Sequence, residues 1–138
     1  MWKKIKALKT VDCVIAGVTV GEGNRADTFG ALILGVYDDA GELQCVGRVG
    51  TGFDRGMIEL LHRRLAAIQG DMPFRTMPEL AGEVKFWCRP ELVAEVEYLM
   101  FTPDRALRAP SFQRLMEDRP PEDCRFPSEV TVRTGTAR

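Results

Sequence analysis

The chain has 138 residues, of which 45% are hydrophobic, which is enough for one compact core and too few for two domains of ordinary size. Its 19 basic and 20 acidic residues give a formal net charge of -1, so the overall charge excludes a generally basic nucleic-acid binder. No apolar run approaches the roughly 20 residues that span a bilayer, and the N-terminus does not resemble a signal peptide. We therefore expect no membrane partner and a cytoplasmic location.

The first part of the chain predicts three strands. Residues 11–18 are apolar and rich in β-branched side chains, whereas the polar, glycine-rich stretch 19–28 is typical of a loop. Residues 29–37 are apolar on both faces, which indicates a central strand. The turn residues 38–41 then lead to a third strand at 43–49, so an antiparallel hairpin is predicted.

Three glycines, Gly47, Gly50 and Gly52, lie at the end of the third strand and just before a helix. One interpretation is a cradle of backbone N–H groups for a phosphate. The spacing is neither a Walker A loop nor a dinucleotide fingerprint, and Asp54 would place negative charge beside the phosphate. The preferred interpretation is therefore a tight corner that needs glycine for positive φ or close backbone approach.

One helix is predicted after this corner. Asp54 suits the N-cap position, and Gly70 ends the helical pattern. His62 lies within the pattern and is interpreted as a surface or boundary residue rather than a catalytic base. The apolar stripe at helical spacing consists of Met57, Ile58, Leu61, Leu65 and Ile68.

The second half predicts a loop at 71–82, a short strand at 84–88 and a longer strand at 92–101 with one wet face. Beyond residue 103 the chain is irregular, with a short helix predicted at 111–117. Three strands, one helix and two strands indicate an all-β fold with one helix. The predicted architecture is a five-stranded Greek-key OB-fold barrel with its helix between strands three and four. An α+β sandwich remains the alternative.

The sequence contains no pattern that predicts a self-sufficient enzyme. The four cysteines, Cys13, Cys45, Cys88 and Cys124, form no CxxC pair, so we expect buried thiols and no metal site. No Ser-His-Asp set and no close pair of carboxylates stands out. Any chemistry must therefore involve other groups, and basic side chains are the candidates.

Basic residues gather at three places. Lys4 and Lys6 share a strand face and suit a polyphosphate or a nucleic-acid backbone, although such a pair is more often a solvated chain end. Arg48 is expected to share a face with Gln44 and Val46, on the barrel surface that OB folds use for nucleic acid. The third cluster contains Arg105, Arg108, Arg114 and Arg119, whose guanidinium groups suit phosphate contact. Taken alone, it is better explained as an exposed charged segment in which the neighbours Asp118 and Arg119 pair locally.

Several stretches, in this order along the chain, resemble one family. They are WKKIK at 2–6, GALILGVY at 30–37, VGRVGTGF at 46–53, WCRPELVAEV at 87–96, LRAPSF at 107–112 and EDRPPEDC at 117–124. Together they resemble the C-terminal OB domain of ATP-dependent DNA ligases, particularly the ligase D group of bacterial non-homologous end joining. The first stretch is similar to the fifth motif of the nucleotidyltransferase superfamily, and the last two are similar to the sixth.

The resemblance implies how the chain is divided and what it binds. Residues 1–10 would end an adenylation domain, 11–124 would form the OB-fold domain, and 125–138 would be a flexible tail. The implied cofactors are ATP and Mg2+, bound mainly by an adenylation domain, and the implied DNA partner is a nicked duplex in the nucleoid. The implied catalytic residues are Lys4, Lys6, Arg108, Asp118 and Arg119, and the implied DNA-binding residues are Arg25, Arg48, Lys85 and Arg89.

The sequence also departs from the family. The adenylated lysine of the K-x-D-G motif is absent, so the isolated chain is expected not to adenylate itself. In the last motif, usually R-x-D-K, Met116 stands in place of the arginine and Arg119 in place of the lysine. Two other functions remain open, namely an independent OB-fold DNA-binding module without a catalytic role and a degenerate domain kept for protein contacts.

Overall fold

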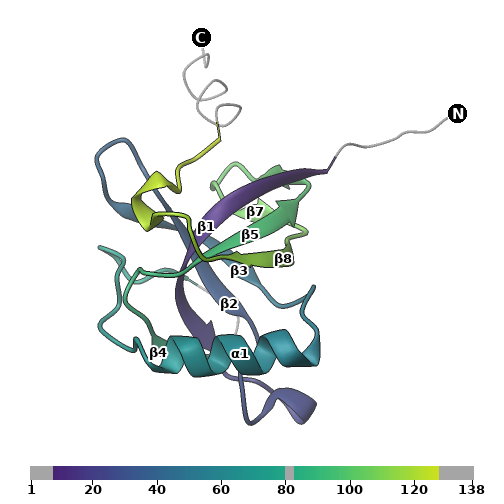
Figure 1. Cartoon of the computed structure of the whole chain (residues 1–138). Helices are drawn as coiled ribbons and strands as arrows, with labels where there is room; N and C mark the ends of the chain where they lie inside the picture. The colour runs from purple at the N-terminus through teal and green to yellow at the C-terminus, as the bar shows by residue number, and fades with distance from the viewer. Residues whose placement is uncertain (1–7, 80–82, 128–138) are drawn as a thin grey trace, which may run out of the picture.

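A computed structural model describes residues 8–79 and 83–127 (Figure 1). Lys4 and Lys6 lie outside these residues, as do 128–138 of the expected tail. No helix in the described ranges has the length and apolar character needed to cross a membrane. The strands and helices are β1 (Lys9–Thr19), η1 (Gly23–Arg25), β2 (Leu32–Tyr37), β3 (Leu43–Val49), α1 (Arg55–Ala66), β4 (Val84–Trp87), β5 (Val93–Tyr98), β6 (Met100–Phe101), β7 (Leu107–Arg108), β8 (Ser111–Met116) and η2 (Pro121–Asp123).

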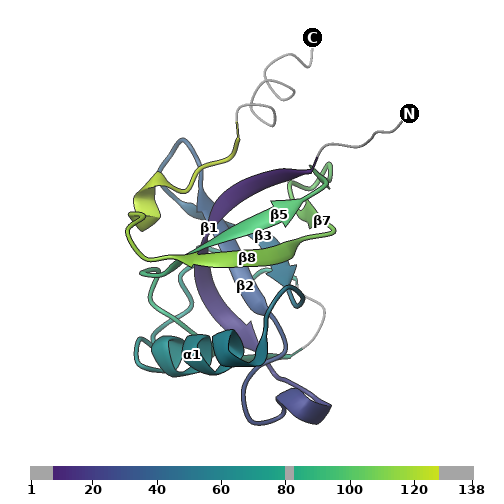
Figure 2. The ribbon, with the colours of Figure 1, turned by 45° about the vertical axis from the view of Figure 1, so that its right-hand side comes forward.

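Five strands form the barrel in the order β3-β2-β1-β5-β8, and every pairing between neighbours is antiparallel. The backbone N–H of Phe112 in β8 donates to the carbonyl of Thr51, just after β3, at 2.9 Å, and so links the two ends of this order. Figures 1 and 2 show α1 lying across one end of the barrel. The predicted OB-fold architecture, with its helix after the third strand, is confirmed.

The core lies between the strands and α1. In β2 the residues from Leu32 to Val36 are all buried, as expected for a central strand with two apolar faces. From the helix, Leu61 and Leu65 are fully buried, whereas the other members of the predicted stripe are half-buried. The side chain of Asp54 accepts a hydrogen bond from the Met57 N–H at 2.7 Å, which confirms the predicted N-cap.

The predicted helix at 111–117 is wrong, because Ser111–Met116 is strand β8. Phe112 and Leu115 are three residues apart, a spacing that imitates one face of a helix. In the fold this segment pairs with β5 instead, and a bulge between Glu95 and Val96 accommodates the irregular register. The fifth strand of the barrel is therefore β8, and its fourth is β5.

Two other strand predictions change in detail. The predicted strand at 84–88 is β4, which pairs with the end of β1 as an additional strand outside the five of the barrel. The predicted strand at 92–101 is interrupted at Leu99, whose N–H donates to the Arg108 carbonyl at 3.0 Å. The chain then turns back through the short β6–β7 hairpin.

The glycine-rich corner after β3 is confirmed as a structural requirement. Gly47 and Gly52 have φ values of 110° and 95°, a region that side chains with a Cβ rarely adopt. A Cβ on Gly52 would lie 2.7 Å from the Phe112 nitrogen, so only glycine allows β8 to approach this corner.

One predicted strand face is wrong. A bulge shifts the β2–β3 register around Val46, so Val46 is fully buried while Gln44 and Arg48 are exposed.

Candidate functional site

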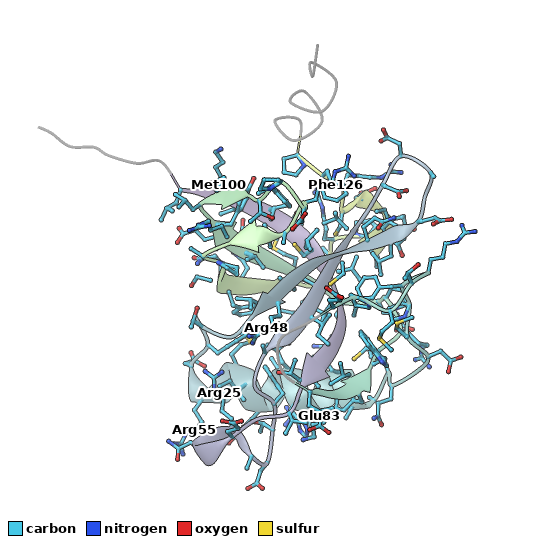
Figure 3. The ribbon with its side chains drawn as sticks, turned by 180° about the vertical axis from the view of Figure 1, so that it is seen from behind. Arg25, Arg48, Arg55, Glu83, Met100 and Phe126 are labelled. Carbon is cyan, nitrogen blue, oxygen red and sulfur yellow. The ribbon has the colours of Figure 1, made fainter. Side chains whose placement is uncertain are left out.

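Arg48 is an exposed side chain on β3, directly opposite Ile33 of β2 in the antiparallel pairing. Figure 3 shows Arg48, Arg25 and Arg55 running from β3 toward the end of the molecule that carries α1. Guanidinium groups bind phosphate oxygens well, and the surface of strands two and three is the usual binding face of an OB fold. The predicted position of Arg48 on an open face is therefore confirmed, although a contact with DNA stays a prediction.

Arg25 is engaged by the protein itself. Its Nη1 donates to the carbonyls of Gly30 and Gly50, both at 2.9 Å, and its guanidinium carbon lies 5.6 Å from the ring centroid of Phe53. These contacts tie the loop between β1 and β2 to the corner after β3. The structure therefore gives Arg25 a part in holding the loop, beside its predicted contact with DNA.

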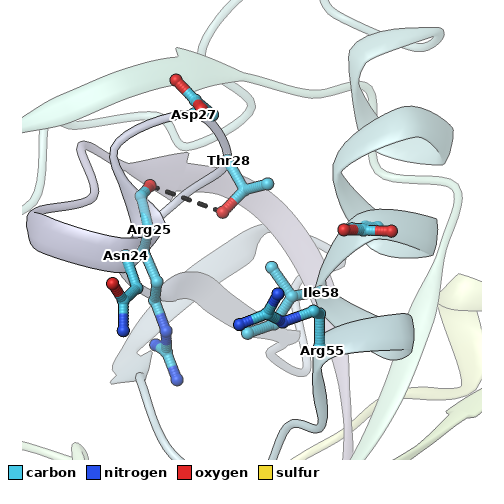
Figure 4. A pocket seen from close by; sticks show the side chains of 7 residues that line it. Asn24, Arg25, Asp27, Thr28, Arg55 and Ile58 are labelled. Carbon is cyan, nitrogen blue, oxygen red and sulfur yellow. Dashed lines mark hydrogen bonds between the residues drawn. The ribbon is translucent and has the colours of Figure 1, made fainter.

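A cavity of about 440 Å³ opens between this loop and the first turn of α1 (Figure 4). The place of Arg55 in this lining is not predictable from the sequence, because a lone arginine at the start of a helix carries no signal that distinguishes it from a solvated charge. The lining combines basic and acidic groups, and consists of Asn24, Arg25, Asp27, Thr28, Arg55, Ile58 and Glu59.

Lys85, in β4, contacts the same loop. Its Nζ donates to the carbonyl of Thr28 at 2.5 Å and is 3.4 Å from Nε2 of His62. Partial burial of the imidazole, followed by the nearby charge of Lys85, lowers the pKa of His62 below its usual value. Arg89, by contrast, is paired with Glu91 at 2.6 Å, and no contact joins it to Lys85 in the described part of the chain.

The segment 116–119, which carries the last family-like motif, leaves β8 and is held at two points. Glu117 pairs with Arg64 of α1 at 3.3 Å, and Nε of Arg119 pairs with Asp12 of β1 at 3.1 Å. The predicted local pairing of Asp118 with Arg119 is wrong, because the guanidinium turns to the barrel rather than to its sequence neighbour. Asp118 itself is exposed.

Arg108, a predicted catalytic residue within the described ranges, does not lie in this segment. Arg108 is exposed on the β6–β7 hairpin, directly opposite Met100. Figure 3 labels Met100 and Phe126 at this end of the molecule. Phe126 packs against Phe101, and the guanidinium of Arg105 lies 4.7 Å from the Phe126 ring centroid. No described contact joins Arg108 to the residues of 116–119.

The thiols confirm the expectation that they act as small buried hydrophobes. Cys13, Cys88 and Cys124 are buried, and Cys45 is half-buried. Burial raises the pKa of Cys88 to about 12, and burial, followed by nearby negative charge from Asp12, raises that of Cys124 to about 12. Within the described ranges, no group of three or more His, Cys, Asp or Glu side chains is placed to hold a metal ion.

The raised thiol pKa predicts a loss of stability at alkaline pH. A thiol whose folded-state pKa is about 12 instead of 9.0 stabilises the fold fully below pH 9, and this contribution is lost as the pH rises through 12. Between pH 9 and pH 11 the free energy of unfolding should fall with rising pH in the wild type. In Cys88→Ala this fall should be smaller by about 1 kcal/mol per pH unit. Urea titrations at several pH values measure this decline.

Val96→Ala is the matched control for this comparison, because it removes a fully buried group and keeps every thiol. It should lower stability at all pH values and leave the alkaline decline as steep as in the wild type. An equally steep decline in Cys88→Ala would contradict the prediction.

Comparison with known proteins shows which protein family this chain is similar to. The family model described as "ATP dependent DNA ligase C terminal region" matches residues 25–119. The multifunctional non-homologous end joining protein LigD of Mycolicibacterium smegmatis is 40% identical over 88% of this chain and 16% of its own length. The DNA ligase of Methanoculleus marisnigri is 34% identical over 100% of this chain and 25% of its own length. The chain thus spans a minor part of each relative.

Two solved structures share both fold and sequence with the chain. The ligase domain of M. tuberculosis LigD superposes with a TM-score of 0.78 at 33% identity, covering 85% of this chain and 38% of that domain. The mycobacterial DNA ligase D complexed with ATP and MES superposes with a TM-score of 0.72 at 32% identity, covering 87% of this chain and 38% of that one.

Proposed function

The chain belongs to the family of C-terminal regions of ATP-dependent DNA ligases, and we propose that it is the OB-fold part of such an enzyme, of the bacterial end-joining type. In this role it closes over the nucleotide during lysine adenylation and then clamps nicked duplex DNA while the nick is sealed. The observation that carries the proposal is the family match across 25–119 on a barrel that superposes on a LigD ligase domain with a TM-score of 0.78.

The exposed arginine on β3 supports the DNA-clamping role. Arg48 is free to meet the DNA backbone, because in the described part of the chain its side chain pairs with no carboxylate, in contrast to Arg89 and Arg114. A contact of this kind fixes the protein on the duplex without reading its sequence. Such a contact suits a ligase, which must act at breaks in any sequence.

The nucleotide-closing role draws on the arginines of the last motif. Guanidinium groups match the geometry of phosphate oxygens, and both Arg108 and Arg119 have solvent-exposed side chains. The ATP-bound mycobacterial ligase D supports ATP as the nucleotide. We place ATP and Mg2+ mainly on an adenylation domain, which would supply the reactive lysine, while the residues of this chain orient the phosphates.

A reconstitution experiment tests the function. This chain is added to the adenylation domain of the M. smegmatis LigD relative from which the matching C-terminal region has been removed. We expect the mixture to transfer AMP to the 5′-phosphate of a nicked duplex, whereas neither part does so alone. The absence of any stimulation, together with equal binding of nicked and intact duplex by this chain, would instead support an independent DNA-binding module.

Arg48 should contribute to DNA binding through one phosphate. Arg48→Gln is expected to weaken binding to all duplex sequences alike and to reduce the slope of log K against log salt by about one. Fluorescence anisotropy from low to moderate salt measures both quantities. Arg75→Gln is the matched control, because Arg75 is an exposed arginine already paired with Glu42, and its loss changes the net charge equally. If both variants bind alike, Arg48 is not a DNA contact.

A further inference from the structure

Arg119 has an unexpected partner for a residue that the proposed function directs toward nucleotide phosphates. Its Nε lies 3.1 Å from Oδ2 of Asp12, whose side chain is only 17% exposed. The pair joins the segment that follows β8 to β1, which is the middle strand in the order β3-β2-β1-β5-β8. The neighbouring Glu117 is held by Arg64 of α1, so the segment carrying Arg119 is fastened to the barrel and the helix together.

The surroundings of this pair are acidic. Asp12 lies directly opposite Glu95 in the pairing of β1 with β5, and two carboxylates in this position repel each other unless cations offset them. Arg119 forms an ion pair with Asp12, and Arg114 forms one with Glu95 at 2.7 Å. Moving Arg119 away would leave Asp12 without its cation beside a second carboxylate.

A surface cavity of about 310 Å³ lies at the same place. Its charged lining comprises three carboxylates and two guanidinium groups, namely Asp12, Glu95, Asp123, Arg119 and Arg125. Among the lining residues the carboxylates outnumber the guanidinium groups by one, and Arg119 is already paired with Asp12, so the cavity does not favour a polyphosphate. In this arrangement Arg119 neutralises the protein's own carboxylates instead of offering its charge to a ligand.

We propose that Asp12 is a positioning residue that holds Arg119 against the barrel. The guanidinium of Arg119 then pairs either with Asp12 or with a phosphate group of the nucleotide. This inference rests on the proposed function, because it concerns the arginine that would close over ATP. Contact with the phosphates competes with this ion pair for the positive charge of Arg119, and the strength of the ion pair sets how readily the segment 116–119 is released. Asp12 thereby lowers the phosphate affinity of the free domain.

Titration of the chain with inorganic tripolyphosphate, followed by the NMR signal of the Arg119 Nε–H group, tests the proposal. Asp12→Asn keeps the shape of the side chain and removes its charge, so we expect it to bind tripolyphosphate about three- to fivefold more tightly than the wild type. Damage to the fold would weaken binding rather than strengthen it. The gain should disappear when Arg119→Gln is added to Asp12→Asn.

Glu42→Gln is the matched control, because it makes the same charge change and releases an arginine, Arg75, from an ion pair elsewhere. It should leave the affinity unchanged. If Asp12→Asn fails to fold, Asp12→Thr, which places a strand-favouring side chain in β1, takes its place. Equal or weaker binding by the Asp12 variant, or a gain that persists without Arg119, would overturn the proposal. The titration uses neither DNA nor an adenylation domain, so its failure is distinguishable from failure of the proposed function.

Discussion

Gly52→Ala is expected to lower the free energy of unfolding by about 2–5 kcal/mol. Two separate costs add at this position. The φ value of 95° disfavours any residue with a Cβ, and the added Cβ would lie 2.7 Å from the backbone nitrogen of Phe112 and 2.8 Å from Oγ of Ser111. Since Phe112 is where β8 meets the corner after β3, relief of the clash would push the last strand away and open the barrel.

Gly41→Ala separates the two costs. Gly41 also has a positive φ, 82°, but a Cβ there would meet no atom within 4 Å. This variant should lose only the conformational cost, about 1–2 kcal/mol. Urea unfolding of both variants gives the comparison, and hydrogen exchange at Phe112 shows whether β8 has separated in Gly52→Ala. Equal losses in the two variants would mean that close approach of β8 is not what requires Gly52.

Local sequence signals predicted the first half of the fold well. The third strand was predicted with the bounds that the structure has, Leu43–Val49, because a turn on one side and glycines on the other fix its ends. The N-cap Asp54 was predicted for the same reason, since a capping side chain acts on a backbone group three residues away. Signals of this kind need no knowledge of the rest of the chain.

The errors arose where distant segments decide the structure. Ser111–Met116 became a strand because β5 offers it a pairing edge, which no pattern within the segment reveals. Likewise, Val46 is buried because the register of β2 against β3 contains a bulge, and alternation alone assigns it to the wrong face.

The candidate site shows the same division between local and distant causes. Sequence and resemblance located Arg48 and Arg119, but the partner of Arg119 is Asp12, at the opposite end of the chain sequence. Sequence neighbours suggested Asp118 instead, because the tertiary fold that brings β1 beside the β8 segment cannot be deduced from local charge. Lys4 and Lys6 lie outside the described residues, so their roles stay predictions.

Arg25→Ala should separate a structural role from a DNA-binding role, and we expect the structural effect to dominate. The substitution removes two charge-assisted hydrogen bonds and leaves the carbonyls of Gly30 and Gly50 without this donor, for a loss of about 2–4 kcal/mol in unfolding free energy. Loss of the contact with Phe53 adds to this. Thermal and urea unfolding measure the loss, and Arg25→Lys should recover only part of it, because one ammonium group cannot reproduce the planar guanidinium.

Arg48→Gln should have the opposite effect to Arg25→Ala. Because Arg48 is exposed, its substitution should weaken DNA binding with little change in the free energy of unfolding. Measured at a temperature where both variants are fully folded, Arg25→Ala should retain most of the wild-type affinity if, in the wild-type complex, the Arg25 guanidinium stays on the two carbonyls. A large loss of affinity with unchanged stability in Arg25→Ala would reverse this assignment. It would mean that Arg25 exchanges its backbone partners for DNA phosphates, and that the loop between β1 and β2 is rearranged when the duplex binds.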